Sequence, residues 1–74
     1  MYKMNIEYLQ KFAKNLKRIR KAKKLTQDDL AVSDEISRST IGMIETVQTD
    51  LTVSKVKIIA DAMGVHPKEL FDFD

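Results

Sequence analysis

The 74-residue sequence has no cysteine or tryptophan, and only one histidine, one proline and two glycines. Without cysteine, the chain can form neither a disulfide framework nor a thiolate site. Two glycines are too few for a glycine-rich phosphate-binding loop. His66, the single histidine, stands before Pro67 at an expected helix start, and no other histidine or cysteine joins the acidic residues in a metal site. We therefore expect no enzyme activity, no metal and no cofactor.

Long apolar runs are also absent. No stretch approaches the roughly 18–20 apolar residues of a membrane-spanning helix, and the N-terminus lacks the basic start and apolar stretch of a signal peptide. We expect a cytoplasmic protein without a membrane partner. Seventy-four residues suffice for one domain, 1–74, whose thin core favours tight helix packing or a partner subunit.

The net charge of +2 conceals a strong separation of charge along the chain. Nine of the 13 Lys and Arg residues lie in residues 1–24, where Glu7 is the only acid. Residues 25–36 contain four acids and no base. A basic front part indicates a polyanionic partner, although lysines on the solvated face of a helix would give the same composition.

Residues 26–46 contain two short helical patterns that meet at a turn. The first begins with Thr26 and Asp29, which have the spacing of a capping box. The second begins at Ser37, a good N-cap, and turns two isoleucines toward the core. The polar turn between them ends in Ile36, which can also reach the core. Two helices joined this tightly predict a helix-turn-helix.

This stretch resembles the Cro/phage-repressor-type helix-turn-helix family of bacterial and phage transcriptional regulators, over about residues 12–71. The matching residues here are Leu25, Thr26, Gln27, Leu30, Ala31, Ile36, Ser37, Ile41, Ile44 and Glu45. Lys24 and Glu35 occupy positions where the family commonly has glycine. If φ is positive there, each costs on the order of 1 kcal/mol, so we expect strained turns. The loop after residue 45 departs too, with Val47 and Leu51 where glycine and proline are typical.

Three further helices complete the predicted fold. Residues 6–23 show helical spacing of apolar residues, with lysines on the other faces. A fourth helix follows the N-cap Thr52 and ends at Gly64. Its expected inner stripe is Val53, Val56, Ile59, Ala60 and Met63. A short fifth helix follows Pro67. Since no strand pattern occurs, we predict an all-α fold, a compact bundle of five short helices with the helix-turn-helix at about residues 26–46.

The resemblance implies that the helix from about Ser37 to Thr46 enters the major groove of double-stranded DNA, where base edges can be distinguished. By the same resemblance, Gln27 bonds a phosphate, while Arg38 and Ser39 begin the set that reads bases. The full expected DNA-binding set is Lys24, Gln27, Ser37, Arg38, Ser39, Gly42, Met43, Thr46, Gln48 and Thr49.

Three members of this set have alternative explanations. In the middle of a helix, glycine at position 42 lowers stability by about 1 kcal/mol relative to alanine. Close approach of the backbone to the floor of the groove would explain why glycine stands there, and chance would explain it equally well. Met43 could contact a thymine methyl group or simply be exposed. Arg38 could read guanine with its guanidinium fork, hold a phosphate, or pair with Asp34 or Glu35 across the turn.

The resemblance also implies an internal ion pair between Arg20 and Glu45. The C-terminal end carries more apolar side chains than a small monomer easily hides, which indicates a homodimer interface once some of them have capped the core. The expected interface residues are Ile58, Leu70, Phe71 and Phe73.

We therefore expect a sequence-specific double-stranded DNA-binding transcriptional regulator that acts as a homodimer. Small phage repressors, Cro-like proteins and restriction-modification controllers are of this kind. An alternative of a different class is an antitoxin that neutralises a toxin partner, with or without DNA binding. A protein-interaction module that has lost DNA binding is a third alternative, because residues 37–46 carry few outward donors.

Overall fold

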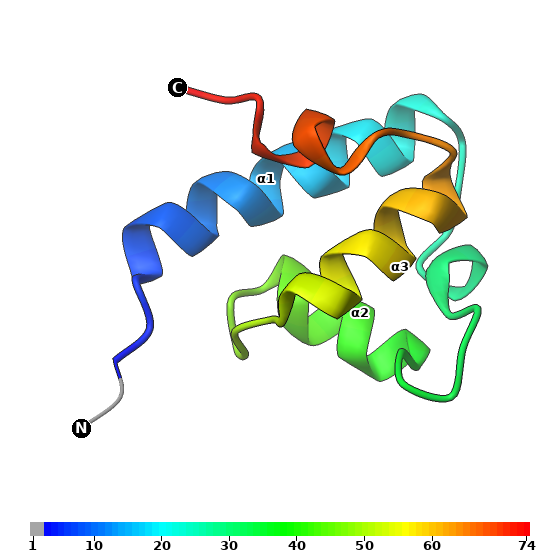
Figure 1. The fold of residues 1–74 in the computed structure, drawn as a ribbon, viewed down its shortest axis with the longest axis horizontal. Coiled ribbons are helices and arrows are strands. Elements are labelled where there is room, and N and C mark those ends of the chain that lie inside the picture. The colour runs from blue at the N-terminus through cyan, green and yellow to red at the C-terminus, as the bar shows by residue number, and fades with distance from the viewer. Residues whose placement is uncertain (1–2) are drawn as a thin grey trace.

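The computed structural model describes residues 3–74, which form five helical elements. In chain order these are α1 (Ile6–Ala22), the 3-10 helix η1 (Asp28–Leu30), α2 (Arg38–Glu45), α3 (Val53–Met63) and the 3-10 helix η2 (Pro67–Phe71). The C-terminal η2 lies beside α1, which also contacts α2 (Figure 1). Within residues 3–74 the only β-type pairing is an isolated bridge, so the predicted all-α class is confirmed.

The core is built from apolar side chains of all five elements and of the turn before α2. Leu16, Leu30, Ile41, Ile59 and Leu70 are fully buried, one from each element. Ile36 in the turn is also fully buried, as predicted. Each element thus contributes at least one side chain to a shared core. This core fixes the position and orientation of α2 relative to the other elements.

The prediction of five short α-helices is wrong for the second and fifth elements, which are 3-10 helices of three and five residues. The capping box is present, with Asp29 N–H donating to Thr26 Oγ1 at 3.1 Å and Thr26 N–H donating to Asp29 Oδ2 at 2.7 Å. The chain nevertheless leaves the helical conformation at Ala31 (ψ 65°). We attribute this to Ile36, because a continuous helix would carry the polar residues after Leu30 inward and leave Ile36 out of the core.

Asn15 explains why η2 remains short. Its side-chain Nδ2 donates to the backbone oxygens of Glu69 and Leu70, at 2.9 and 3.0 Å. Its Oδ1 accepts a 2.8 Å hydrogen bond from Arg18 Nη2. Asn15 is 5% exposed. A buried amide whose donors are satisfied by two helix carbonyls ties the end of η2 to α1, in place of a further helical turn.

The ends of the α-helices follow their expected caps. Thr52 Oγ1 accepts from the N–H of Lys55 at the start of α3, and Gly64 ends that helix with φ 71°. The expected inner stripe of α3 needs one correction, since Val53 is 87% exposed. As the first residue of α3, Val53 extends past the end of the core, whereas the other four stripe residues are buried.

No helix within residues 3–74 has the length and hydropathy required to cross a membrane.

Candidate nucleic-acid interface

The N-terminal turn of α2 presents Arg38 and Ser39 to solvent. Ser37 is the N-cap, and its hydroxyl accepts a 3.1 Å hydrogen bond from the N–H of Thr40. Within residues 3–74, the Arg38 side chain forms no hydrogen bond and no ion pair. The pairing across the turn considered from the sequence is therefore not formed, and the Arg38 guanidinium is available to another molecule.

The C-terminal part of α2 and the loop that follows it carry further expected DNA contacts. Met43 is 40% exposed. Thr46 Oγ1 donates to the backbone oxygen of Gly42 at 2.8 Å and accepts from Gln48 Nε2 at 2.8 Å. Thr49 is half-buried and donates to the backbone oxygen of Asp50 at 3.0 Å. Thr46 and Thr49 therefore have donors engaged within the protein, whereas the exposed Met43 offers an apolar contact at this end.

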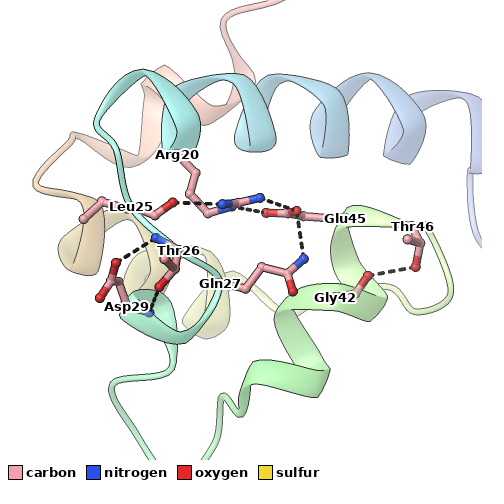
Figure 2. A network of polar contacts seen from close by, with 8 residues as sticks. All are labelled: Arg20, Leu25, Thr26, Gln27, Asp29, Gly42, Glu45 and Thr46. Carbon is pink, nitrogen blue, oxygen red and sulfur yellow. Dashed lines mark hydrogen bonds and ion pairs between the residues drawn. The ribbon is translucent and has the colours of Figure 1, made fainter.

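Behind this face, a buried ion pair joins α1 to α2. Arg20 Nε lies 2.7 Å from Glu45 Oε2, and Arg20 Nη2 lies 3.0 Å from Glu45 Oε1. The two side chains are only 9% and 2% exposed. Arg20 Nη1 also donates to the backbone oxygen of Leu25 at 2.8 Å, and Gln27 Nε2 donates to Glu45 Oε1 at 3.1 Å (Figure 2). The ion pair implied by the resemblance is present, and it extends into a network that includes Gln27.

The charges of this network reinforce one another. Burial opposes ionisation of Glu45, but the hydrogen bonds from Arg20 and Gln27, with the nearby charges of Arg20 and Lys17, outweigh it and lower the pKa of Glu45. The hydrogen bonds that Arg20 donates to Glu45 raise the pKa of Arg20 despite its burial. Both groups are therefore charged at neutral pH, and removal of one would leave the other buried without its partner.

Gly42 and Gln27 lie against each other at the edge of the exposed face. A Cβ atom at Gly42 would lie 3.8 Å from Gln27 Oε1 and 4.0 Å from Gln27 Nε2, at ordinary van der Waals distance. Beside them an open hollow of about 570 Å³ is lined by Arg20, Leu25, Thr26, Gln27, Asp28 and Arg38. The structure thus brings Gln27, Gly42 and Arg38, all expected from the sequence, to one side of the molecule.

Two non-glycine residues adopt a positive φ, one in the turn after α1 and one in the loop after α2. Lys24 (φ 59°) follows α1, and Val47 (φ 58°) follows α2. The strain expected at Lys24 is present. The strain expected at Glu35 is not, because the turn before α2 closes through the hydrogen bond from Ile36 N–H to the Ser33 oxygen without a positive φ. For a β-branched residue such as Val47 this conformation is especially unfavourable.

The residues expected at a homodimer interface are not all available to a partner. Leu70 is fully buried and caps the core, which removes it from that set. Ile58 and Phe73 are partly buried against the core, while Phe71 is 41% exposed. The ring of Phe71 packs against Phe12, with centroids 5.0 Å apart.

Sequence reasoning placed Phe71 at an interface but missed Val53 and the other residues that surround it. Two adjoining hollows share Val53, Val56 and Phe71 in their walls. We name the apolar rim of these hollows the Val53 surface, made of Tyr8, Leu9, Leu51, Val53, Pro67 and Phe71. The position of Val53 directly after the Thr52 cap was the signal that could have revealed it, because first-turn residues often face outward. Asn15 was also missed, although a polar residue between Phe12 and Leu16 pointed to a buried hydrogen bond.

The chain resembles known proteins in both sequence and fold. The sequence model that describes the helix-turn-helix family matches residues 16–70 of this chain. Curated protein sequences gave no match. A similar crystal structure is that of the restriction-modification controller protein C.AhdI from Aeromonas hydrophila, with 35% identity and a TM-score of 0.79. The match covers 85% of this chain and 96% of that protein. The chain therefore belongs to the Cro/phage-repressor-type helix-turn-helix family and is a DNA-binding transcriptional regulator.

Proposed function

We propose that the protein regulates transcription as a homodimer that places α2 of each copy in the major groove of an operator. The observation that carries this proposal is the contrast between the two sides of α2. Its inner side is held by Ile41, Ile44 and the Glu45 ion pair, whereas its first turn offers Arg38 without any partner within residues 3–74. A rigid helix with a free guanidinium fits direct reading of guanine in the major groove.

The remaining expected contacts are proposed to hold the DNA backbone. Lys24 is exposed at the end of α1, and Gln27 lies beside α2 at the edge of the same face. Phosphate contacts set register and orientation, while base contacts set sequence preference. We assign Lys24, Gln27, Thr46, Gln48 and Thr49 to the backbone, and Arg38, Ser39 and Met43 to the bases.

The proposed dimer forms through the Val53 surface. Val53 protrudes beside a hollow whose wall includes Pro67 and Phe71, so a two-fold pairing would let each copy insert Val53 into the hollow of the other. Isologous pairing of this kind is the common arrangement of homodimers. It suits an operator whose half-sites are about 34 Å apart. Association would also add buried apolar surface to a small domain with a thin core.

We further propose that the protein acts in the cytoplasm by occupancy of its operator, in the manner of a restriction-modification controller. The similarity to the controller protein C.AhdI over most of both chains supports this role.

Selection of bound fragments from a random double-stranded DNA pool tests the proposal. The expected result is a two-fold symmetric site with a preferred G·C pair in each half. Enrichment of no sequence over the starting pool would contradict it. Copurification of a small protein partner together with such a failure would favour the antitoxin alternative.

A further inference from the structure

We infer that Glu45 is a positioning residue for DNA binding, because its carboxylate holds the Gln27 side-chain amide in the orientation that offers a free N–H to a DNA phosphate. The inference rests on the proposed function, in which Gln27 contacts the DNA backbone. It adds that the buried ion pair of the fold and this phosphate contact act as one unit.

The chemistry of the amide explains the orientation. A glutamine side chain has two N–H donors and one oxygen acceptor. Gln27 uses one N–H on Glu45 Oε1, at 3.1 Å. The opposite orientation would place the amide oxygen against a carboxylate oxygen, and two acceptors repel each other. The second N–H of Gln27 has no partner within residues 3–74, and Gln27 lines the open hollow that also holds Arg38, where a phosphate could reach this donor.

The support beneath Gln27 is rigid. Arg20 holds both carboxylate oxygens of Glu45, which is itself almost fully buried. Arg20 is held in turn by the backbone oxygen of Leu25 at the start of the turn that carries Gln27 (Figure 2). Three segments of chain therefore converge on the carboxylate that orients the amide. Side-chain freedom of Gln27 is lost on folding and not on binding, which is the condition for a preorganised contact.

Gly42 lies on another side of the Gln27 amide. Both polar atoms of the Gln27 amide lie 3.8–4.0 Å from the position of a Cβ atom at Gly42. An alanine there would touch the amide, and any longer side chain would compete with it for space. Glycine at position 42 thus leaves the space next to the amide open, while glutamate at position 45 holds the amide by a hydrogen bond.

The first experiment measures the effect of Gln27→Ala on operator affinity in two backgrounds. One is the parent protein, and the other carries Arg20→Met with Glu45→Met, which replaces the buried pair by apolar side chains of similar volume. Such replacements often preserve stability. In the parent, Gln27→Ala is expected to weaken binding about three- to tenfold, the usual size of one hydrogen bond. In the apolar background, which lacks the carboxylate, it is expected to change affinity less than twofold. An equal loss in both backgrounds would overturn the inference.

A second measurement uses the parent protein alone and does not depend on the apolar background folding. The side-chain amide protons of Gln27 are followed by NMR while the pH is lowered through the titration of Glu45. Their shifts are expected to follow that titration, whereas those of the exposed Gln10, which forms no hydrogen bond to a carboxylate within residues 3–74, change much less. Gln27 signals that titrate no more than those of Gln10 would overturn the inference. Failure of the parent to enrich any DNA sequence would overturn the proposed function itself, a result distinct from equal losses in the two backgrounds.

Discussion

Arg20 in α1 and Glu45 at the end of α2 face each other across the edge of the core and are joined at two points, with 2.7 and 3.0 Å between nitrogen and oxygen. The pair connects the longest helix to the helix that is proposed to meet DNA. Its side chains have almost no exposure, which distinguishes it from the exposed pair between Lys57 and Asp61 on α3.

We predict that Glu45→Ala destabilises the protein severely, even without DNA. Loss of one partner of a buried pair costs roughly 3–5 kcal/mol, which corresponds to a fall in Tm of at least about 12 °C for a domain of this size. Asp61→Ala is the matched control, since the exposed pair should contribute less than about 1 kcal/mol. Thermal unfolding of both variants checks the prediction, and a Glu45→Ala variant within a couple of degrees of the parent would refute it.

The lowered pKa of Glu45 predicts how stability depends on pH. The unfolded chain takes up a proton on Glu45 near the ordinary value of 4.5, before the folded protein does. This contribution to stability is therefore complete above the ordinary value and is lost as the pH falls through the lower, folded pKa. We expect the free energy of unfolding to fall between pH 5 and pH 3, and less steeply in Glu45→Gln. Denaturant titrations at several pH values measure this. Asp29 also has a lowered pKa, through its hydrogen bonds from Thr26, so Asp29→Asn is measured in parallel.

Lys24→Gly should improve stability while weakening DNA binding. Glycine tolerates the positive φ, so the folded state is stabilised by about 1–2 kcal/mol. Glycine also gives the unfolded chain more conformational freedom, which offsets about 0.4–1 kcal/mol of this stabilisation. The expected outcome is a Tm a few degrees higher, with the salt dependence of operator binding flattened by about one unit of slope. Lys23→Gly is the control, because Lys23 has φ −90° and gains no such relief. A lower Tm for Lys24→Gly would show that no strain is stored there.

Arg38→Ala tests whether this residue reads a base. A bidentate contact to guanine is worth about 1–3 kcal/mol of discrimination. We expect weaker operator binding and loss of preference at one G·C pair, with nonspecific affinity nearly unchanged. Titrations against the selected operator and its single-base variants, at two salt concentrations, provide the measurement. Equal losses on every sequence would assign Arg38 to phosphate and leave Ser39 and Met43 as the residues for direct reading.

Val53→Asp should separate association from folding. Val53 is 87% exposed, so its replacement removes little buried apolar surface from the monomer. An acidic residue in the first turn of α3 also interacts favourably with the helix dipole, by about 0.3–1 kcal/mol. A charge buried in the proposed interface would weaken the dimer. Analytical ultracentrifugation at micromolar concentration should show a dimer for the parent and dissociation for this variant. Val32→Asp, at an exposed valine outside the Val53 surface, is expected to leave the dimer intact. A parent that is monomeric both alone and with DNA would contradict the interface.

The periodic parts of the sequence predicted the structure well. Apolar spacing predicted α1 to within a residue of its C-terminal end, and the burial of Ile36 followed from its place in a polar turn. The pattern could not predict that the segment after Thr26 forms only one 3-10 turn, since that depends on which side chain the core accepts next. For the same reason it assigned Val53 to the core.

The buried ion pair was predictable because a family pattern supplied it. Arg20, Gln27 and Glu45 were all expected, but the hydrogen bond between Gln27 and Glu45 joins positions that are 18 residues apart, and no local spacing encodes it. Positive φ was expected at Lys24 and Glu35 and is found at Lys24 and Val47. Backbone conformation at a turn follows from how the flanking elements pack, which residue type alone does not determine.

The hydrogen bonds from Asn15 to the carbonyls of Glu69 and Leu70 have a consequence for the way the molecule opens. They join positions 54 and 55 residues apart, so they form only when the chain has closed on itself. A five-residue 3-10 helix is too short to persist alone, and η2 therefore exists only while α1 is in place to hold it. Opening of either segment exposes Leu70 and frees the other. Helices α1 and η2 thus belong to one cooperative unfolding unit, although they are the helical elements most distant in sequence.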